Sequence, residues 1–229
     1  MRHIGAIVVV AALCAAPTLA DWSDNFDSYD TGSSMHGQGG WAGWQGDATW
    51  TAYTTDTLAL SAPNSVDING DADLVRPYIG YTSGQWTYKA MQYIPDDFTG
   101  ESYFILLNTY DLFTSTFNWS VQVSFDAATE LVESESEGAT LPLITGQWVE
   151  IRADIDLDAD NVTLYYDGQL LSSKSWTDGL SGSGALNIGA VDLFANGAST
   201  IYYDDIALIP EPASLGLLAL AGLVALRRR

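Results

Sequence analysis

The chain has 229 residues, of which 29 are acidic and only eight are basic, so its formal net charge at pH 7 is −21. So few cations cannot neutralise phosphates or anionic headgroups, which excludes nucleic acid and anionic membrane surfaces as partners. The single cysteine, Cys14, excludes a disulfide within the chain. The many carboxylates suit either solubility in a salty exterior or the binding of calcium.

The first 20 residues are typical of a secretory signal peptide. Their start is basic, the stretch 4–16 is apolar, and small residues lead to Ala20. Such a segment is removed on export, and cleavage after Ala20 would leave Asp21 as the new N-terminus. The apolar run is shorter than the roughly 20 residues that a membrane-spanning helix needs.

The segment Asp21–Ile209 is long enough for one domain with a sizeable core. Apolar and polar residues alternate along it, as expected of strands that bury one face, and no amphipathic helical window stands out. The expected strands are 85–94, 102–109, 117–125, 149–157, 162–167, 185–194 and 200–209. Many short strands separated by turn dipeptides predict an all-β fold, a two-sheet antiparallel jelly-roll sandwich.

Two tryptophans near the start lie in a glycine-rich loop, Gly39–Trp44. Aromatic faces on such a loop can stack on sugar rings, so Trp41 and Trp44 are the candidate ligand-binding residues. The alternative is that the loop folds over and plugs the edge of the sandwich, since tryptophan is usually mostly buried.

Two acidic segments have spacings that resemble calcium-binding loops. Asp156–Asp167 has acids at EF-hand positions, but Asn161 replaces the turn glycine and no helices flank it. Asp67–Asp73 is similar. We expect a turn in each segment, with ion binding as the alternative.

The segments Gly146–Ile151, Asp154–Leu157 and Val162–Gln169 resemble the central hairpin of concanavalin A-like jelly rolls. That group includes laminin G-like modules, legume lectins and laminarinase-type glycosidases. Asn25–Tyr29 and Tyr202–Ile206 fit its paired terminal strands. The resemblance implies a fold, and a fold alone does not fix a function.

The run from Glu133 to Glu137 resembles the acidic strand motif of laminarinase-type glycosidases. The resemblance implies that Glu133 and Glu137 act as nucleophile and acid/base from one face of a strand, with Glu135 between them. However, Glu135 stands where the family has Asp, serines replace its apolar residues, and Ala127–Gly138 looks more like an acidic loop or a helix. We therefore expect no catalytic residue, and the three glutamates remain the alternative.

In many of these jelly rolls, oxygens near the first strand and a carboxylate on the last strand hold one calcium ion. Asp205 matches the last-strand position and Asp27 is its expected partner, with Asp24 and Asp204 as alternates. Calcium takes 6–8 oxygen ligands, so carbonyls and water would complete the shell. A structural calcium ion would offset the lack of disulfides.

The last 20 residues contain Pro210-Glu211-Pro212, an apolar stretch to Leu226 and three terminal arginines. These features resemble a PEP-CTERM sorting signal, which occurs in bacteria that make exopolysaccharide. The resemblance implies recognition by an exosortase, a membrane transpeptidase. The apolar stretch is expected to form a short transmembrane helix that anchors the protein transiently in the inner membrane, with the arginines on the cytoplasmic side.

Together these features predict three regions: a signal peptide at 1–20, a jelly-roll domain at 21–209 and a sorting signal at 210–229. The expected function is that of a non-catalytic protein of the cell envelope or extracellular matrix, associated with a glycan such as exopolysaccharide. A degenerate or unusual glycoside hydrolase and a purely structural coat protein are the alternatives.

Overall fold

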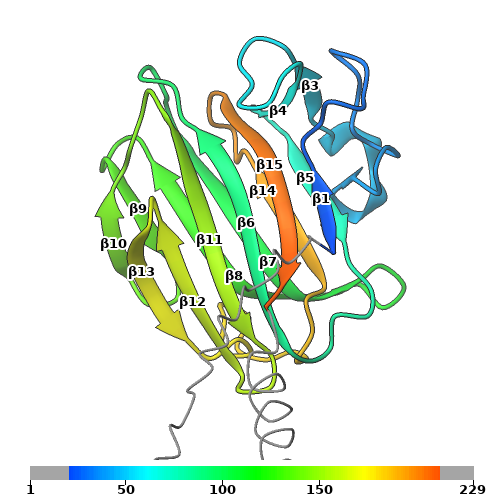
Figure 1. The fold of residues 1–229 in the computed structure, drawn as a ribbon, viewed down its shortest axis with the longest axis vertical. Helices are drawn as coiled ribbons and strands as arrows, with labels where there is room; N and C mark the ends of the chain where they lie inside the picture. Colours follow the sequence, from blue (N-terminus) through cyan, green and yellow to red (C-terminus); the bar gives the residue numbers. More distant parts are fainter. Residues whose placement is uncertain (1–20, 212–229) are drawn as a thin grey trace, which may run out of the picture.

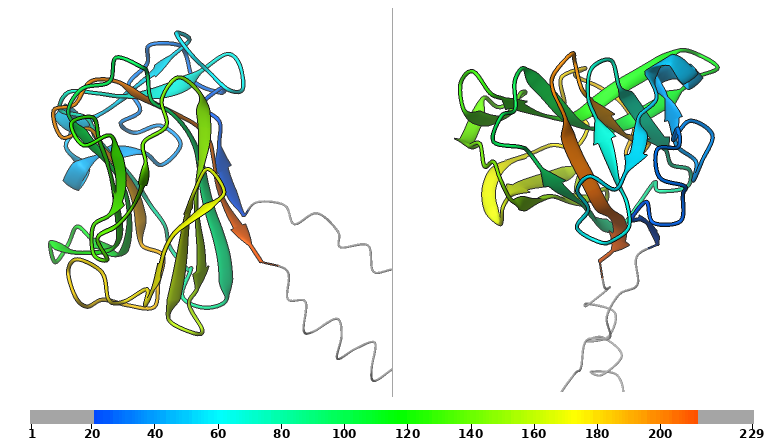
Figure 2. Two further views of the ribbon diagram at one scale, coloured as in Figure 1. Left: turned by 90° about the vertical axis from the view of Figure 1, so that its left-hand side faces the viewer. Right: turned by 90° about the horizontal axis from the view of Figure 1, so that it is seen from above.

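The computed structural model describes residues 21–211, which form two antiparallel sheets packed face to face (Figures 1 and 2). The prediction of an all-β, jelly-roll-like sandwich is confirmed. The predicted cleavage site at Ala20, Pro212 and the apolar tail lie outside the described residues. Among residues 21–211, no helix has the length and apolar character needed to cross a membrane.

Sheet A has the strand order β13-β12-β11-β6-β15-β4-β3, with β1 also paired to β15. Its strands are β1 (Trp22–Asp24), β3 (Tyr53–Thr55), β4 (Ser65–Ile68), β6 (Gln85–Tyr93), β11 (Trp148–Asp156), β12 (Asn161–Tyr166), β13 (Gln169–Lys174) and β15 (Ile201–Pro210). The hairpin expected in Asp156–Asp167 is present between β11 and β12.

Sheet B has the order β10-β9-β8-β7-β14-β5-β2. Its strands are β2 (Ala42–Gly43), β5 (Asp73–Pro77), β7 (Glu101–Asp111), β8 (Thr116–Asp126), β9 (Leu131–Ser134), β10 (Ala139–Pro142) and β14 (Ala190–Phe194). Two short 3-10 turns, η1 (Trp44–Gly46) and η2 (Ala48–Trp50), follow β2. The loop or helix expected at Ala127–Gly138 is wrong, because β9 occupies its middle.

The main core lies between the sheets. Along β11, buried and half-buried residues alternate without exception, so Ile151 and its same-face neighbours point inward. Trp176, Tyr203 and Phe104 are among the largest side chains that are almost fully buried there. This packing of many apolar side chains is the main source of stability in a domain without disulfides.

The two ends of the domain leave it side by side. β1 pairs with β15 in the register Trp22↔Leu208, and the backbone N–H of Asp21 donates to the Leu208 carbonyl at 2.9 Å. The predicted pairing of terminal strands is therefore confirmed, although the first strand is Trp22–Asp24 rather than Asn25–Tyr29. Figure 2 shows both ends at the same end of the sandwich.

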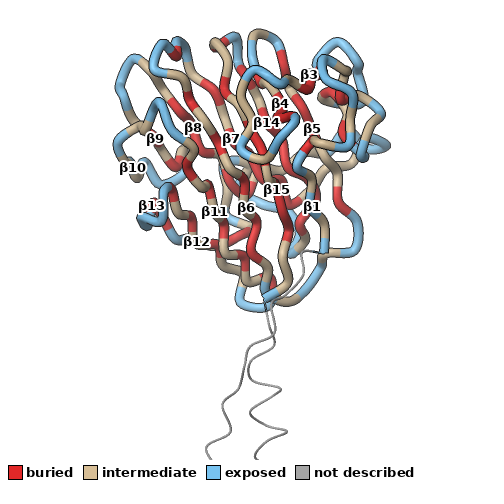
Figure 3. Tube along the Cα trace, turned by 45° about the horizontal axis from the view of Figure 1, so that its top comes forward, coloured by how far each residue is buried: buried red, intermediate tan, exposed pale blue. Residues whose placement is uncertain are grey.

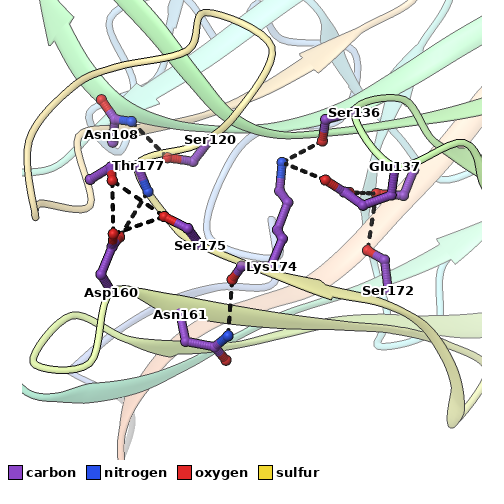
Figure 4. A network of polar contacts seen from close by, with 11 residues as sticks. Asn108, Ser120, Ser136, Glu137, Asp160, Asn161, Ser172, Lys174, Ser175 and Thr177 are labelled. Atoms are coloured by element: carbon purple, nitrogen blue, oxygen red, sulfur yellow. Dashed lines mark hydrogen bonds and ion pairs between the residues drawn. The ribbon is translucent and has the colours of Figure 1, made fainter.

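A pair of bulges interrupts β7 and β8. In β8, Val121 is opposite Leu106 and Trp119 is opposite Leu107, which leaves Ser120 as an extra residue between them. In β7, Asn108 is the corresponding extra residue. The Asn108 amide donates to the Ser120 hydroxyl at 2.8 Å (Figure 4). A bulge turns the residues beyond it to the other face of a sheet.

The bulges overturn the alternation predicted for 117–125. Val121, Val123 and Phe125 face the core, whereas Phe117 and Trp119 join a separate cluster on the outer face of sheet B. The regular alternation expected along the whole of 117–125 is therefore wrong, because Ser120 shifts the pattern by one residue.

Candidate functional site

The outer face of sheet B carries a second apolar cluster. Val75, Ile105, Leu107 and Ala190 are at most 3% exposed, although they lie on the face turned away from the main core. Along β7 and β14 no position is exposed (Figure 3). Something other than the opposite sheet therefore covers this face.

Aromatic rings provide this cover. The Trp44 ring, from η1, lies 4.8 Å from Phe117, 5.4 Å from Tyr110 and 6.0 Å from Trp119 between ring centroids. Tyr103 and Phe194 stack on each other at 5.9 Å with an interplanar angle of 16°. These residues come from η1, β7, β8 and β14, so four separate segments build one aromatic surface.

The turn that carries Trp44 requires an unusual backbone. A Cβ atom at Gly43 would lie 2.0 Å from the Asp47 carbonyl oxygen, so only glycine fits there. Gln45 has φ +54°, and its backbone N–H donates to the Tyr110 hydroxyl at 3.0 Å. These contacts fix the turn over the sheet.

Two adjoining hollows lie beside the aromatic surface, with volumes of about 520 and 660 Å³. We call them together the groove. The side chains common to both hollows are Trp44, Gln45, Asp73, Phe194 and Asn196. Tyr103, Ile105, Phe117, Trp119, Gln122 and Asp192 line the first hollow, and Asp47, Trp50, Asp71 and Gly197 line the second. No lysine or arginine is among these residues.

A pair of carboxyl groups lies within the groove. Asp73 on β5 is opposite Phe194, and Asp192 on β14 is opposite Val75, so both carboxyls lie on the outer face two residues apart in register. Asp192 is only 3% exposed. The Oδ1 atoms of Asp73 and Asp192 are both buried without a hydrogen-bond partner in the described protein.

Burial raises the pKa of both groups. Desolvation by burial raises the pKa of Asp73 to about 6. The pKa of Asp192 lies well above its usual range because of desolvation first and the neighbouring Asp73 charge second. The pair therefore titrates as a unit and keeps a proton to higher pH than ordinary aspartates.

The predicted ligand residues Trp41 and Trp44 have different positions. Trp41 is 1% exposed and its indole N–H donates to Asp24 Oδ2 at 2.9 Å. The prediction that Trp41 stacks on a sugar is wrong, because its ring packs against Phe26 and Trp22 in the core. Trp44 is half-buried and lines the groove.

The carboxylates predicted to hold calcium take part in separate contacts. Asp27 accepts from the Asn25 amide at 2.7 Å and from the backbone N–H of Asn64 at 3.0 Å. Asp205 accepts from the Ser61 hydroxyl at 3.2 Å and lines a hollow that also contains Lys89. A calcium ion on this pair stays a prediction.

The alternates, Asp24 and Asp204, are occupied by hydrogen bonds. Asp24 accepts from Phe26 N–H and from the Tyr29 and Trp41 side chains. Asp204 is buried and accepts four hydrogen bonds, two of them from the backbone of Leu60 and Ser61. In residues 21–211 no three acidic, histidine or cysteine side chains converge in a way that would hold a metal ion.

The glutamates considered as an alternative catalytic set do not share a strand. β9 ends at Ser134, and Glu135 and Glu137 lie in the turn that follows. Glu137 pairs with Lys174 at 3.6 Å (Figure 4). It also accepts a hydrogen bond from the Ser134 hydroxyl at 2.7 Å. The premise that Glu133 and Glu137 project from one strand face is therefore wrong. Glu137 instead joins the edges of the two sheets.

The Pro-Glu-Pro segment, which the sequence predicts to be a sorting motif, begins where the domain ends. Pro210 is the last residue of β15, opposite Trp86. The Glu211 backbone N–H donates to the Gln85 carbonyl at 2.9 Å, and its carboxylate accepts from the Thr87 hydroxyl.

The sequence-based interpretation missed most of the groove. It named Trp41 and Trp44 alone among the tryptophans as ligand-binding residues, and it did not single out Asp192 or Phe194. A signal was present: Tyr103–Leu107 and Ala190–Phe194 are nearly continuous apolar runs. Such runs indicate a strand that is covered on both faces, and a lone Asp192 inside one is therefore a buried polar group.

No protein-family model and no curated protein matches the sequence. Among solved structures, the sandwich is similar to an endo-beta-1,4-glucuronan lyase from the fungus Trichoderma reesei, with a TM-score of 0.53 and 9% identity over 84% of this chain and 96% of that chain. It is also similar to a sialidase, with a TM-score of 0.51 and 8% identity over 80% of this chain. The match covers only 18% of the sialidase. At these identities the likeness shows the fold alone.

Proposed function

We propose that this protein is an exported, non-catalytic glycan-binding protein of the cell envelope or extracellular matrix, and that its groove binds the saccharide chain. The observation that carries the proposal is the aromatic surface on the outer face of sheet B. A sheet face turned away from the main core normally carries polar residues, yet this one holds Trp44, Tyr103, Phe117, Trp119 and Phe194.

The groove has the chemistry that a saccharide needs. Sugar rings have apolar faces that stack on aromatic side chains, and their hydroxyls need donors and acceptors at the edges. The amides of Gln122 and Asn196 and the carboxyls of Asp73 and Asp192 supply both. The volumes of about 520 and 660 Å³ fall within the range typical of ligand pockets.

The arrangement of the candidate glutamates supports binding rather than hydrolysis. A retaining glycosidase holds its two carboxyls about 5–5.5 Å apart. Glu133 lies on β9, whereas Glu137 lies in the turn that follows and is held by Lys174 and Ser134, so the two do not project from one strand as such a pair would.

The two ends of the sequence support the location. The signal peptide would direct export, and the PEP-CTERM-like tail would direct sorting by an exosortase after a transient stage in the inner membrane. Because both ends of the domain leave it side by side, the tail would tether one end of the sandwich. The cell's own exopolysaccharide is the proposed ligand.

Glycan binding is tested with the full-length chain in a polyoxyethylene detergent, which avoids sugar headgroups. The protein is applied to a glycan array and to gels cast with purified exopolysaccharide, with and without calcium, and is assayed for release of reducing ends. We expect retention on at least one polysaccharide and no hydrolysis. Hydrolysis would favour the glycosidase, and self-assembly without any retention would favour the coat protein.

A further inference from the structure

The two groove carboxyls lack the partners that buried charges normally have. Asp192 is almost fully buried, and an oxygen of Asp192 and one of Asp73 make no hydrogen bond within the described protein. Arg76, also on β5, is held elsewhere: its guanidinium lies 4.6 Å from the Trp22 ring centroid. No basic side chain lines the groove, so among the described residues nothing neutralises the charge of the pair.

A buried carboxylate pair without a counter-charge is unfavourable unless a proton or a cation joins it. A shared proton removes one of the two charges. A divalent cation would satisfy both carboxylates and use the unpartnered oxygens as ligands. The pair also lies at the open groove, so water or a bound molecule can reach the remaining coordination positions.

The available ligand atoms select the type of cation. Asp73, Asp192, Asn196 and Gln122 offer only oxygen ligands, and neither histidine nor cysteine lines the groove. Calcium takes 6–8 oxygens in flexible geometry, whereas zinc and copper favour nitrogen or sulfur. Magnesium demands a more rigid octahedral shell and gives up its waters reluctantly.

We propose that Asp73 and Asp192 bind one calcium ion in the floor of the groove, with side-chain amides and water completing its shell. This site is distinct from the terminal-strand pair Asp27 and Asp205. Aromatic rings line the same hollow, where a saccharide hydroxyl or carboxylate could displace water from the ion. That last step rests on the proposed function, whereas the metal site itself does not.

The test begins with the metal alone. Full-length protein, stripped with a chelator, is titrated with Ca²⁺ by calorimetry and with Tb³⁺ by luminescence excited through tryptophan. We expect saturable Ca²⁺ binding, and Tb³⁺ emission that Ca²⁺ suppresses by competition, because Trp44 and Trp119 line the same groove.

Two nearly isosteric variants locate the ion. Asp192→Asn and Asp73→Asn should each weaken Ca²⁺ binding at least tenfold and abolish the sensitised Tb³⁺ emission. Asp73 is less buried than Asp192, so Asp73→Asn should disturb folding less. It therefore provides an independent measurement if Asp192→Asn folds poorly. The matched controls Asp27→Asn and Asp205→Asn should leave this binding event unchanged.

The opposite results overturn the proposal. Wild-type protein without Ca²⁺ binding at millimolar concentration would mean that the pair shares a proton only. Ca²⁺ binding that survives both groove variants but is lost in Asp27→Asn or Asp205→Asn would place the ion at the terminal strands instead.

A separate measurement tests the link to the saccharide. Retention on exopolysaccharide should weaken at least tenfold on chelation in the wild type and should be insensitive to chelation in Asp192→Asn. Equal retention with and without Ca²⁺ would overturn the link. Absence of retention under all conditions would contradict the proposed function, while the metal titrations would still decide the ion site.

Discussion

The outer faces of the two sheets differ, although both sheets contribute their inner faces to one core. On sheet A, the outward residues of β11 are half-buried, and all but Trp148 are charged. Arg152 lies 3.1 Å from Asp154 and 3.9 Å from Glu150. On sheet B, the outward residues Val75, Ile105 and Leu107 are buried under aromatic rings. The outer face of sheet A along β11 therefore carries mainly charged, half-buried residues, whereas the outer face of sheet B carries a buried apolar cluster covered by aromatic rings.

The difference originates in local backbone features as much as in composition. The bulge residues Asn108 and Ser120 turn Phe117 and Trp119 outward, and the η1 turn brings Trp44 over them. Without these two features, the same residues would lie within the core or at its edge. The groove is therefore built by irregularities, which a regular alternation of residues does not reveal.

The largest expected effect compares outward positions on the two sheets. Ile105→Ala on sheet B should lower the free energy of unfolding by about 3 kcal/mol, because it leaves a cavity in a packed cluster. Met91→Ala, at a half-buried outward position on sheet A, should lower it by about 1 kcal/mol or less. Urea denaturation of both variants measures this. Equal values would contradict the contrast between the faces.

The next largest change in stability is expected when the paired bulge is disrupted. Asn108→Ala should destabilise the protein by about 2 kcal/mol, since it removes hydrogen bonds to Ser120 and to the Ser183 carbonyl in a buried site. It should also weaken retention on exopolysaccharide, because Trp119 would lose its fixed position. A variant that is destabilised but binds exopolysaccharide as tightly as the wild type would show that the bulge is not needed for binding in the groove.

The carboxyl pair should make stability depend on pH when calcium is absent. The pKa values of Asp73 and Asp192 are higher in the folded than in the unfolded protein, so the folded state binds more protons. Stability from this source is complete below the unfolded value near 3.8 and is lost as the pH rises through about 6. The melting temperature should therefore fall between pH 4 and 7.

Asp192→Asn provides the control for that measurement. It removes one carboxyl of the pair, so the fall in melting temperature should be smaller than in the wild type. Tyr110 and Tyr203 are coupled to the pair, but burial raises the pKa of both phenols, so they do not titrate in this range. If the melting temperature of Asp192→Asn fell with pH as much as that of the wild type, the buried pair would not be the source of the pH dependence.

The smallest expected effect belongs to sheet A. Arg152→Ala should destabilise the protein by about 0.5–1 kcal/mol, because its ion pairs are one-third exposed and its guanidinium stacks 4.1 Å from the Tyr165 ring centroid. Glycan retention should not change. A loss of retention would indicate that the ligand binds to sheet A, which contradicts binding at the groove on sheet B.

The sequence predicted the fold better than the site. The alternation in 149–157 and the turn dipeptides between the strands were sufficient to predict a sandwich, because each depends on local geometry. Trp41 could not be told from Trp44, since burial depends on how the whole loop packs. Asp73 and Asp192 are 119 positions apart, and only the pairing of β5 with β14 brings them together.

The most direct test of the groove compares two half-buried tryptophans on opposite sheets. Trp119→Ala removes a ring from the groove, and Trp148→Ala removes one that packs against Tyr93 on sheet A. The dissociation constant for exopolysaccharide should rise at least tenfold, about 1.4 kcal/mol, in Trp119→Ala and stay near the wild-type value in Trp148→Ala. The reverse order, or an equal loss in both variants, would contradict binding at the outer face of sheet B.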